Sequence, residues 1–121
     1  MKRILIVDDS ETIRNQLRRL LEGKGYEVFE GVDGQNGFEQ LRAHKGVNLI
    51  ICDVNMPNVD GLTMCGKIHL DQDYKSIPIL MLTTESSAEL KSRGKAAGVT
   101  AWITKPFDAE RLIAVLQKLI P

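Results

Sequence analysis

The sequence predicts a doubly wound α/β fold, a (βα)5 arrangement with a five-stranded parallel sheet. Short apolar runs alternate five times along the chain with stretches of helical periodicity. Most of the runs are continuously apolar, which is typical of strands buried on both faces of a parallel sheet. Crossovers between such strands are right-handed, so helices cover both faces. With 121 residues, we expect one domain over residues 1–121.

Each expected strand is a run bounded by polar residues. The first is the motif Ile4-Leu5-Ile6-Val7, which ends at an acidic pair. The second and fifth runs are shorter or more mixed than the others, as expected of strands at the edges of the sheet. The five expected strands cover residues 4–7, 27–29, 48–52, 79–82 and 101–103.

Helix start signals precede four of the five helical stretches, and the third stretch is weaker. The candidate N-cap residues are Ser10, Asp33, Ser86 and Asp108, and Ser86 has capping-box spacing to Glu89. The apolar positions of the first and last helices lie on one face each. Those positions are Ile13, Leu17, Leu20 and Leu21 in the first, and Leu112, Val115, Leu116 and Leu119 in the last; the third helix is expected from Gly61 to His69.

Composition excludes several classes of function. Sixteen basic residues balance sixteen acidic ones, which argues against a generic nucleic-acid or membrane-surface binder. The apolar run near the N-terminus is too short for a signal peptide, and no run approaches the length of about 20 residues that crosses a membrane. Cys52 and Cys65 form no CxxC pattern. We therefore expect a cytoplasmic protein that does not bind nucleic acid or membranes.

Chemically active residues follow four of the expected strands. Asp8 and Asp9 come after the first strand, Asp53 after the third, Thr83 after the fourth and Lys105 after the fifth. In parallel sheets of this kind, binding sites form at the carboxyl ends of the strands. The sequence therefore predicts three carboxylates, a hydroxyl and a lysine at one edge of the sheet.

Three neighbouring carboxylates require a compensating cation. Each pair of like charges at about 4 Å costs roughly 4 kcal/mol at an effective dielectric constant near 20. Mg²⁺ prefers oxygen ligands and commonly serves phosphoryl transfer, and a carboxylate can act as the nucleophile. Asp53 is the best candidate nucleophile because it ends the central strand, with Lys105 and Thr83 placed to contact a phosphoryl group.

These motifs together resemble the response-regulator receiver domains of two-component systems, and most closely the single-domain chemotaxis regulators of the CheY type. The resemblance covers essentially the whole chain and implies a flavodoxin-like sheet with strand order 2-1-3-4-5. It also implies a cis peptide before Pro106. The motifs are Ile6-Val7-Asp8-Asp9-Ser10, the segment 53–61, Met81-Leu82-Thr83 and Lys105-Pro106-Phe107.

The resemblance implies a role for each site residue. Asp53 is the phosphoacceptor and a metal ligand. Asp9 binds Mg²⁺ directly, Asp8 mainly through water, and Asn55 through its backbone carbonyl. Lys105 contacts the phosphoryl group. The protein is then not an enzyme on other substrates, because it catalyses only its own phosphorylation and dephosphorylation.

The resemblance also implies a switch. Thr83 supplies the switch hydroxyl, and Trp102 stands at the aromatic switch position of the fifth strand, where Tyr or Phe is more common. Asn55 and Glu85 take the positions that tune loss of the phosphate, in a combination that resembles the chemotaxis type. Val54 departs from that type, which often has Trp directly after the phosphoacceptor.

The implied partners are a histidine kinase, such as a chemotaxis kinase of the CheA type, and an output protein. The output protein, for example the flagellar motor switch, would bind a monomer through the fourth helix, fifth strand and fifth helix. A phosphorelay intermediate or the excised receiver of a larger regulator remains an alternative.

Two other classes of protein fit the residues less well. Haloacid-dehalogenase-type phosphatases need a second acid where Asn55 stands. A flavin-phosphate binder needs a Gly/Ser/Thr-rich loop after the first strand, where Asp8 and Asp9 would repel the phosphate.

Overall fold

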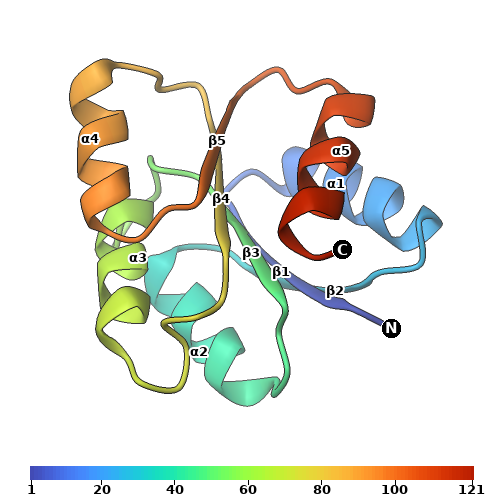
Figure 1. Cartoon of the computed structure of the whole chain (residues 1–121), viewed down its shortest axis with the longest axis horizontal. Coiled ribbons are helices and arrows are strands. Elements are labelled where there is room, and N and C mark those ends of the chain that lie inside the picture. Colours follow the sequence, from blue (N-terminus) through green and yellow to red (C-terminus); the bar gives the residue numbers. More distant parts are fainter.

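The computed structural model describes all residues from 1 to 121 and contains five strands and five helices in strict alternation (Figure 1). The elements are β1 (Arg3–Val7), α1 (Glu11–Gly23), β2 (Glu27–Gly31), α2 (Gly34–Ala43), β3 (Leu49–Cys52), α3 (Gly61–Leu70), β4 (Ile79–Thr83), α4 (Ala88–Ala96), β5 (Ala101–Thr104) and α5 (Ala109–Leu119).

The strands form one parallel sheet in the order β2-β1-β3-β4-β5, which confirms the predicted topology. Helices α1 and α5 cover one face, and α2, α3 and α4 cover the other (Figure 1). Alternate residues of a strand point to opposite faces, so the sheet divides the apolar core in two. Ile4 and Ile6 of β1 pack with Leu17 and Leu116, whereas Leu5 packs on the other face.

The structure extends three of the predicted strands at their C-terminal ends and shifts one helix start. Strands β2, β4 and β5 continue to Gly31, Thr83 and Thr104. The N-cap of α4 is Ser87, whose Oγ accepts a hydrogen bond from Leu90 N at 3.2 Å, so the prediction of Ser86 was wrong. The two serines are adjacent, and α4 starts one residue later than the sequence predicts.

The other three predicted caps are confirmed, and α3 has a cap that was not predicted. Ser10, Asp33 and Asp108 cap α1, α2 and α5, and Asp60 caps the weaker α3 by accepting a hydrogen bond from Thr63 N at 2.8 Å. These side-chain oxygens satisfy backbone N–H groups that the first turn leaves unpaired. None of the helices has the length and apolar character that a bilayer-spanning segment requires.

Candidate functional site

Three of the predicted site residues are the first residues beyond their strands. The backbone N–H of Asp8 donates to Gly31 O at 3.1 Å, and that of Asp53 donates to Val7 O at 3.0 Å. The N–H of Lys105 donates to Thr83 O at 2.8 Å. The sheet ladder thus continues one residue past each strand and fixes all three backbones at the same edge of the sheet. The peptide between Lys105 and Pro106 is cis, as the family resemblance implied.

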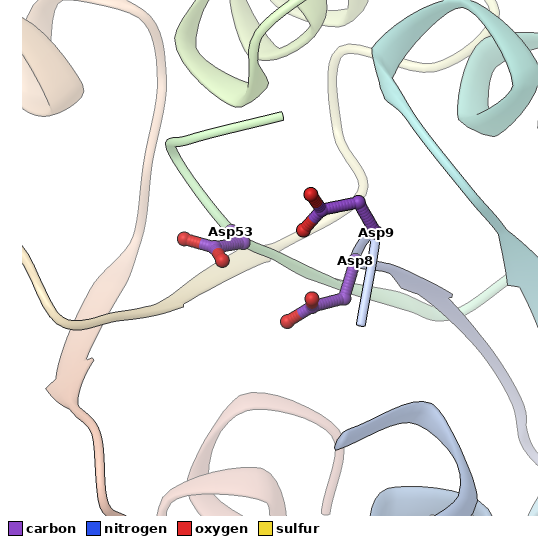
Figure 2. A group of neighbouring side chains, drawn as sticks. All are labelled: Asp8, Asp9 and Asp53. Atoms are coloured by element: carbon purple, nitrogen blue, oxygen red, sulfur yellow. The ribbon is translucent and has the colours of Figure 1, made fainter. Parts of the chain in front are cut away.

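The three carboxylates converge as predicted. Asp8, Asp9 and Asp53 each offer an oxygen within 4.8 Å of the other two, and Figure 2 shows Asp8 and Asp9 at the end of β1 facing Asp53 at the end of β3. Asp8 is 3% exposed and Asp53 is 8% exposed, whereas Asp9 lies open to solvent. An all-oxygen donor set of this charge, open on one side, fits a hard divalent cation that keeps some of its water.

Lys105 lies between two of these carboxylates. Its Nζ donates to Asp8 Oδ2 at 2.8 Å and to Asp53 Oδ2 at 3.0 Å. Burial raises the pKa of the Asp8 carboxyl above its ordinary value, although the bond from Lys105 acts against this. Burial alone would lower the pKa of Lys105, but its bonds to Asp8 and Asp53 outweigh that effect and raise it. The lysine therefore stays charged.

The loop after β4 connects the remaining predicted residues. Thr83 is fully buried, and its Oγ1 accepts a hydrogen bond from Glu85 N at 3.3 Å. Asn55 Nδ2 donates to Glu85 Oε1 at 3.0 Å, and Trp102 Nε1 donates to Glu85 O at 2.9 Å. Glu85 is thus bonded to residues from β4, β5 and the loop after Asp53.

Trp102 packs against α4 through a space that a glycine leaves. A Cβ on Gly94 would lie 2.7 Å from Cζ3 of the indole ring, so any larger residue at this position would overlap the ring. The half-buried Trp102 also places its polar N–H on a carbonyl acceptor, as buried indoles usually do. The ring is therefore held by packing on one side and by a hydrogen bond on the other.

The loop that follows Asp53 is fixed against α2. Asn58 adopts a left-handed conformation with φ of 64°, and its Nδ2 donates to Asp33 Oδ2 at 2.7 Å. Hydrogen bonds from the backbone of Asn36 and from Asn58 lower the pKa of Asp33. A Cβ on Gly61 would overlap the carbonyl oxygen of Asp53, so only glycine permits this close backbone approach.

One residue at the site was not singled out from the sequence. Arg14 Nη1 donates to the backbone carbonyl of Asp8 at 2.6 Å, and its Nε donates to Glu30 Oε1 at 2.9 Å. The sequence signal for it is weak: a charged residue one turn after the N-cap of α1 and an acid near the end of β2. Only the tertiary packing of α1 on β2 shows that the two form a pair.

This fold, with an acidic cluster and a lysine at the carboxyl edge of its sheet, defines the receiver class of signalling domain. The chain matches the response regulator receiver domain family over residues 4–117 and belongs to that family of two-component systems. Receiver domains interact with histidine kinases.

Similar proteins include regulators of different kinds. The chemotaxis protein CheY1 of Helicobacter pylori strain J99 is 36% identical over 119 residues, 98% of this chain and 96% of that protein. The DNA-binding transcriptional regulator RpaA of Synechocystis is 38% identical over 120 residues, 99% of this chain but 49% of RpaA, so the chain spans about half of that relative. The solved structure of chemotaxis protein CheY4 of Vibrio cholerae superposes with a TM-score of 0.93 at 41% identity, covering 99% of both chains.

Proposed function

We propose that Asp53 accepts a phosphoryl group from the phosphohistidine of a histidine kinase. The observation that carries this proposal is the placement of the Asp53 carboxylate beside the Lys105 ammonium, 3.0 Å away, and among two further acids. An oxygen of Asp53 bonds to phosphorus while the P–N bond of the phosphohistidine breaks, and the imidazole nitrogen keeps the electron pair. The protein then acts on no substrate other than its own phosphate.

The acidic cluster fits Mg²⁺ as the cofactor of this step. The carboxylates of Asp8, Asp9 and Asp53 and the backbone carbonyl of Asn55 would hold the ion. When bound, Mg²⁺ supplies charge neutralisation on the transferring phosphoryl group. Lys105 remains beside Asp53 as a second, fixed positive charge for the phosphoryl oxygens.

The hydrogen bonds around Glu85 suggest how the phosphorylated state changes the surface. If the Thr83 hydroxyl turns toward the phosphoryl group, its bond to Glu85 N is lost and the loop after β4 is released on one side. Glu85 also accepts a hydrogen bond from Trp102 through its backbone carbonyl and one from Asn55 through its carboxylate. These bonds support the proposed roles of Thr83 and Trp102 as switch residues, and of Asn55 and Glu85 as residues that tune attack of water on the phosphate.

The setting that we propose is chemotaxis, with the protein a cytoplasmic, monomeric CheY-type regulator. Support comes from the near-complete coverage of CheY1 and CheY4 and from the Asn55–Glu85 pair. The kinase would be of the CheA type, and the output partner, for example the flagellar motor switch, would bind α4, β5 and α5. The similarity to RpaA, of which the chain spans 49%, supports the alternative that the chain is the excised receiver domain of a larger response regulator. A phosphorelay intermediate is the other alternative.

Phosphotransfer from a chemotaxis-type kinase tests this proposal. We expect a phosphorylated CheA-type kinase to lose its label to the wild-type protein within seconds and to retain it with Asp53→Asn. A non-chemotaxis histidine kinase serves as the comparison. Equal transfer to the wild type and to Asp53→Asn would contradict the assignment of Asp53 as the phosphoacceptor. Faster transfer from the non-chemotaxis kinase than from the CheA-type kinase would favour the alternative setting.

A further inference from the structure

Arg14 contacts the backbone of the acidic cluster from the side of α1. Its Nη1 donates a 2.6 Å hydrogen bond to the carbonyl oxygen of Asp8, which belongs to the peptide that joins Asp8 to Asp9. The side chain of Arg14 is only 12% exposed, so the bond is shielded from water. The orientation of this peptide sets the direction in which the next residue, Asp9, leaves the backbone.

Asp9 depends on its backbone more than the other two acids do. Asp8 is held by Ser10 N at 2.9 Å and by Lys105 at 2.8 Å, and Asp53 is held by Lys105 at 3.0 Å. The carboxylate of Asp9 makes no hydrogen bond and no ion pair in the structure. Its place in the cluster is therefore set through its backbone, which Arg14 holds at the preceding peptide and Ser10, at the start of α1, holds on the other side.

The guanidinium of Arg14 is itself fixed. Its Nε donates to Glu30 Oε1 at 2.9 Å, and the other oxygen of Glu30 accepts from Arg18 Nε at 2.7 Å. Arg18 also pairs with Glu22 at 3.0 Å. The planar guanidinium can serve the carboxylate and the carbonyl at once, whereas a lysine ammonium has no such fixed geometry. Arg14 thus connects the end of β2 to the peptide after β1.

We propose that Arg14 is a positioning residue of the magnesium site, acting through the Asp8 carbonyl to hold Asp9 in the metal-binding direction. The inference rests on the proposed function, because it assumes that this cluster binds Mg²⁺. Simple electrostatics predicts the opposite effect of removing Arg14: loss of a nearby positive charge would strengthen binding of a cation. The sign of the change therefore separates the two accounts.

The test measures Mg²⁺ binding by calorimetry without any phosphodonor. We expect Arg14→Gln to raise the Mg²⁺ dissociation constant about tenfold, the lower end of the range for residues that orient metal ligands. Arg14→Lys keeps the charge and one donor group, so its dissociation constant should lie between those of wild type and Arg14→Gln. Urea unfolding checks that each variant is folded. If Arg14→Gln does not fold, the Mg²⁺ dissociation constant of Arg14→Lys tests the proposal instead.

Arg18 provides the matched control. It shares Glu30 with Arg14 and makes no hydrogen bond to Asp8, so Arg18→Gln removes similar ion pairs, and Arg18→Lys alters their geometry, without changing the bond to the Asp8 carbonyl. We expect both to bind Mg²⁺ as wild type does. Unchanged or tighter binding by the Arg14 variants, or equal weakening by the Arg18 variants, would overturn the positioning role. Failure of the wild type itself to bind Mg²⁺ would overturn the proposed function and this inference with it.

Discussion

The Nζ of Lys105 donates a 3.0 Å hydrogen bond to Oδ2 of Asp53, across the edge of the sheet from β5 to β3. The same ammonium bonds Asp8 at 2.8 Å, so one cation joins the proposed phosphoacceptor to the first acidic residue after β1. The two carboxylates repel each other, and Lys105 offsets part of that repulsion when no metal is bound. This contact underlies both the stability of the metal-free site and its chemistry.

Replacement of Lys105 with Met should destabilise the metal-free protein at neutral pH. The loss should be about 2 kcal/mol, because two charged hydrogen-bond acceptors are left without their cation. The pKa of Lys105 is raised above 10.5 in the folded state, so its contribution is complete below that pH and is lost as the pH rises through the folded pKa. Urea unfolding in EDTA measures the difference in the free energy of unfolding between the variant and the wild type. The control is Lys91→Met, because Lys91 is exposed and forms no ion pair. An equal loss in the control would contradict the role given to Lys105.

Asp33 should make the stability of the protein depend on pH in acid. Its pKa is lowered below 3.8 on folding, so its contribution is present above that pH and is lost as the pH falls through the folded value. Asp33→Ala removes the cap of α2 and the bond to Asn58, at a cost of about 1 kcal/mol at neutral pH. Unfolding curves should show this cost shrinking below pH 3.8. Asp33→Asn retains a capping side chain, and a pH dependence equal to wild type in that variant would contradict the account.

Gly94 should be a helix residue that alanine cannot replace while Trp102 is present. Alanine normally stabilises a helix interior over glycine by about 1 kcal/mol, but here its Cβ would overlap the indole ring. We expect Gly94→Ala to destabilise the wild type and to stabilise the Trp102→Ala variant. Gly66 of α3 has open space around it, so Gly66→Ala should be stabilising in both backgrounds. The same sign for Gly94→Ala in both backgrounds would exclude the packing of Trp102 as the cause.

Glu85→Ala should lengthen the lifetime of the phosphorylated protein several-fold. Asn55, two residues after the proposed acceptor, donates to the Glu85 carboxylate at 3.0 Å, and in the proposed role this carboxylate accepts a proton from an attacking water. Decay of the phosphorylated form, followed by intact mass after removal of the donor, gives the rate. Glu89→Ala, in the exposed first turn of α4, is the control and should decay as wild type does. A faster decay of Glu85→Ala would contradict the proposed role.

The sequence predicted the sheet and its acidic edge well because both depend on local patterns. Continuous apolar runs identify buried parallel strands, and the residue after each strand is placed by the sheet ladder itself. That is why Asp8, Asp53 and Lys105 could be assigned to one edge from their order alone. The helix caps Ser10 and Asp33 are similarly local.

Features that depend on contacts between elements could not be predicted. Ser86 and Ser87 are adjacent and offer the same capping side chain, so the sequence does not distinguish them, and the structure has Ser87 as the cap. Trp102 packs against Gly94, and Arg14 pairs with Glu30. Each of these contacts joins two different elements, and the periodicity of a single element does not predict it.

The most direct test of the account is the intact mass of the protein after incubation with acetyl phosphate. We predict one added phosphoryl group in the wild type with Mg²⁺, none in EDTA, and none in Asp53→Asn under either condition. Asp9→Asn, which keeps the acceptor but removes one proposed metal ligand, should need more Mg²⁺ for the same labelling. Equal labelling of the wild type and Asp53→Asn would contradict the central claim that Asp53 is the phosphoacceptor.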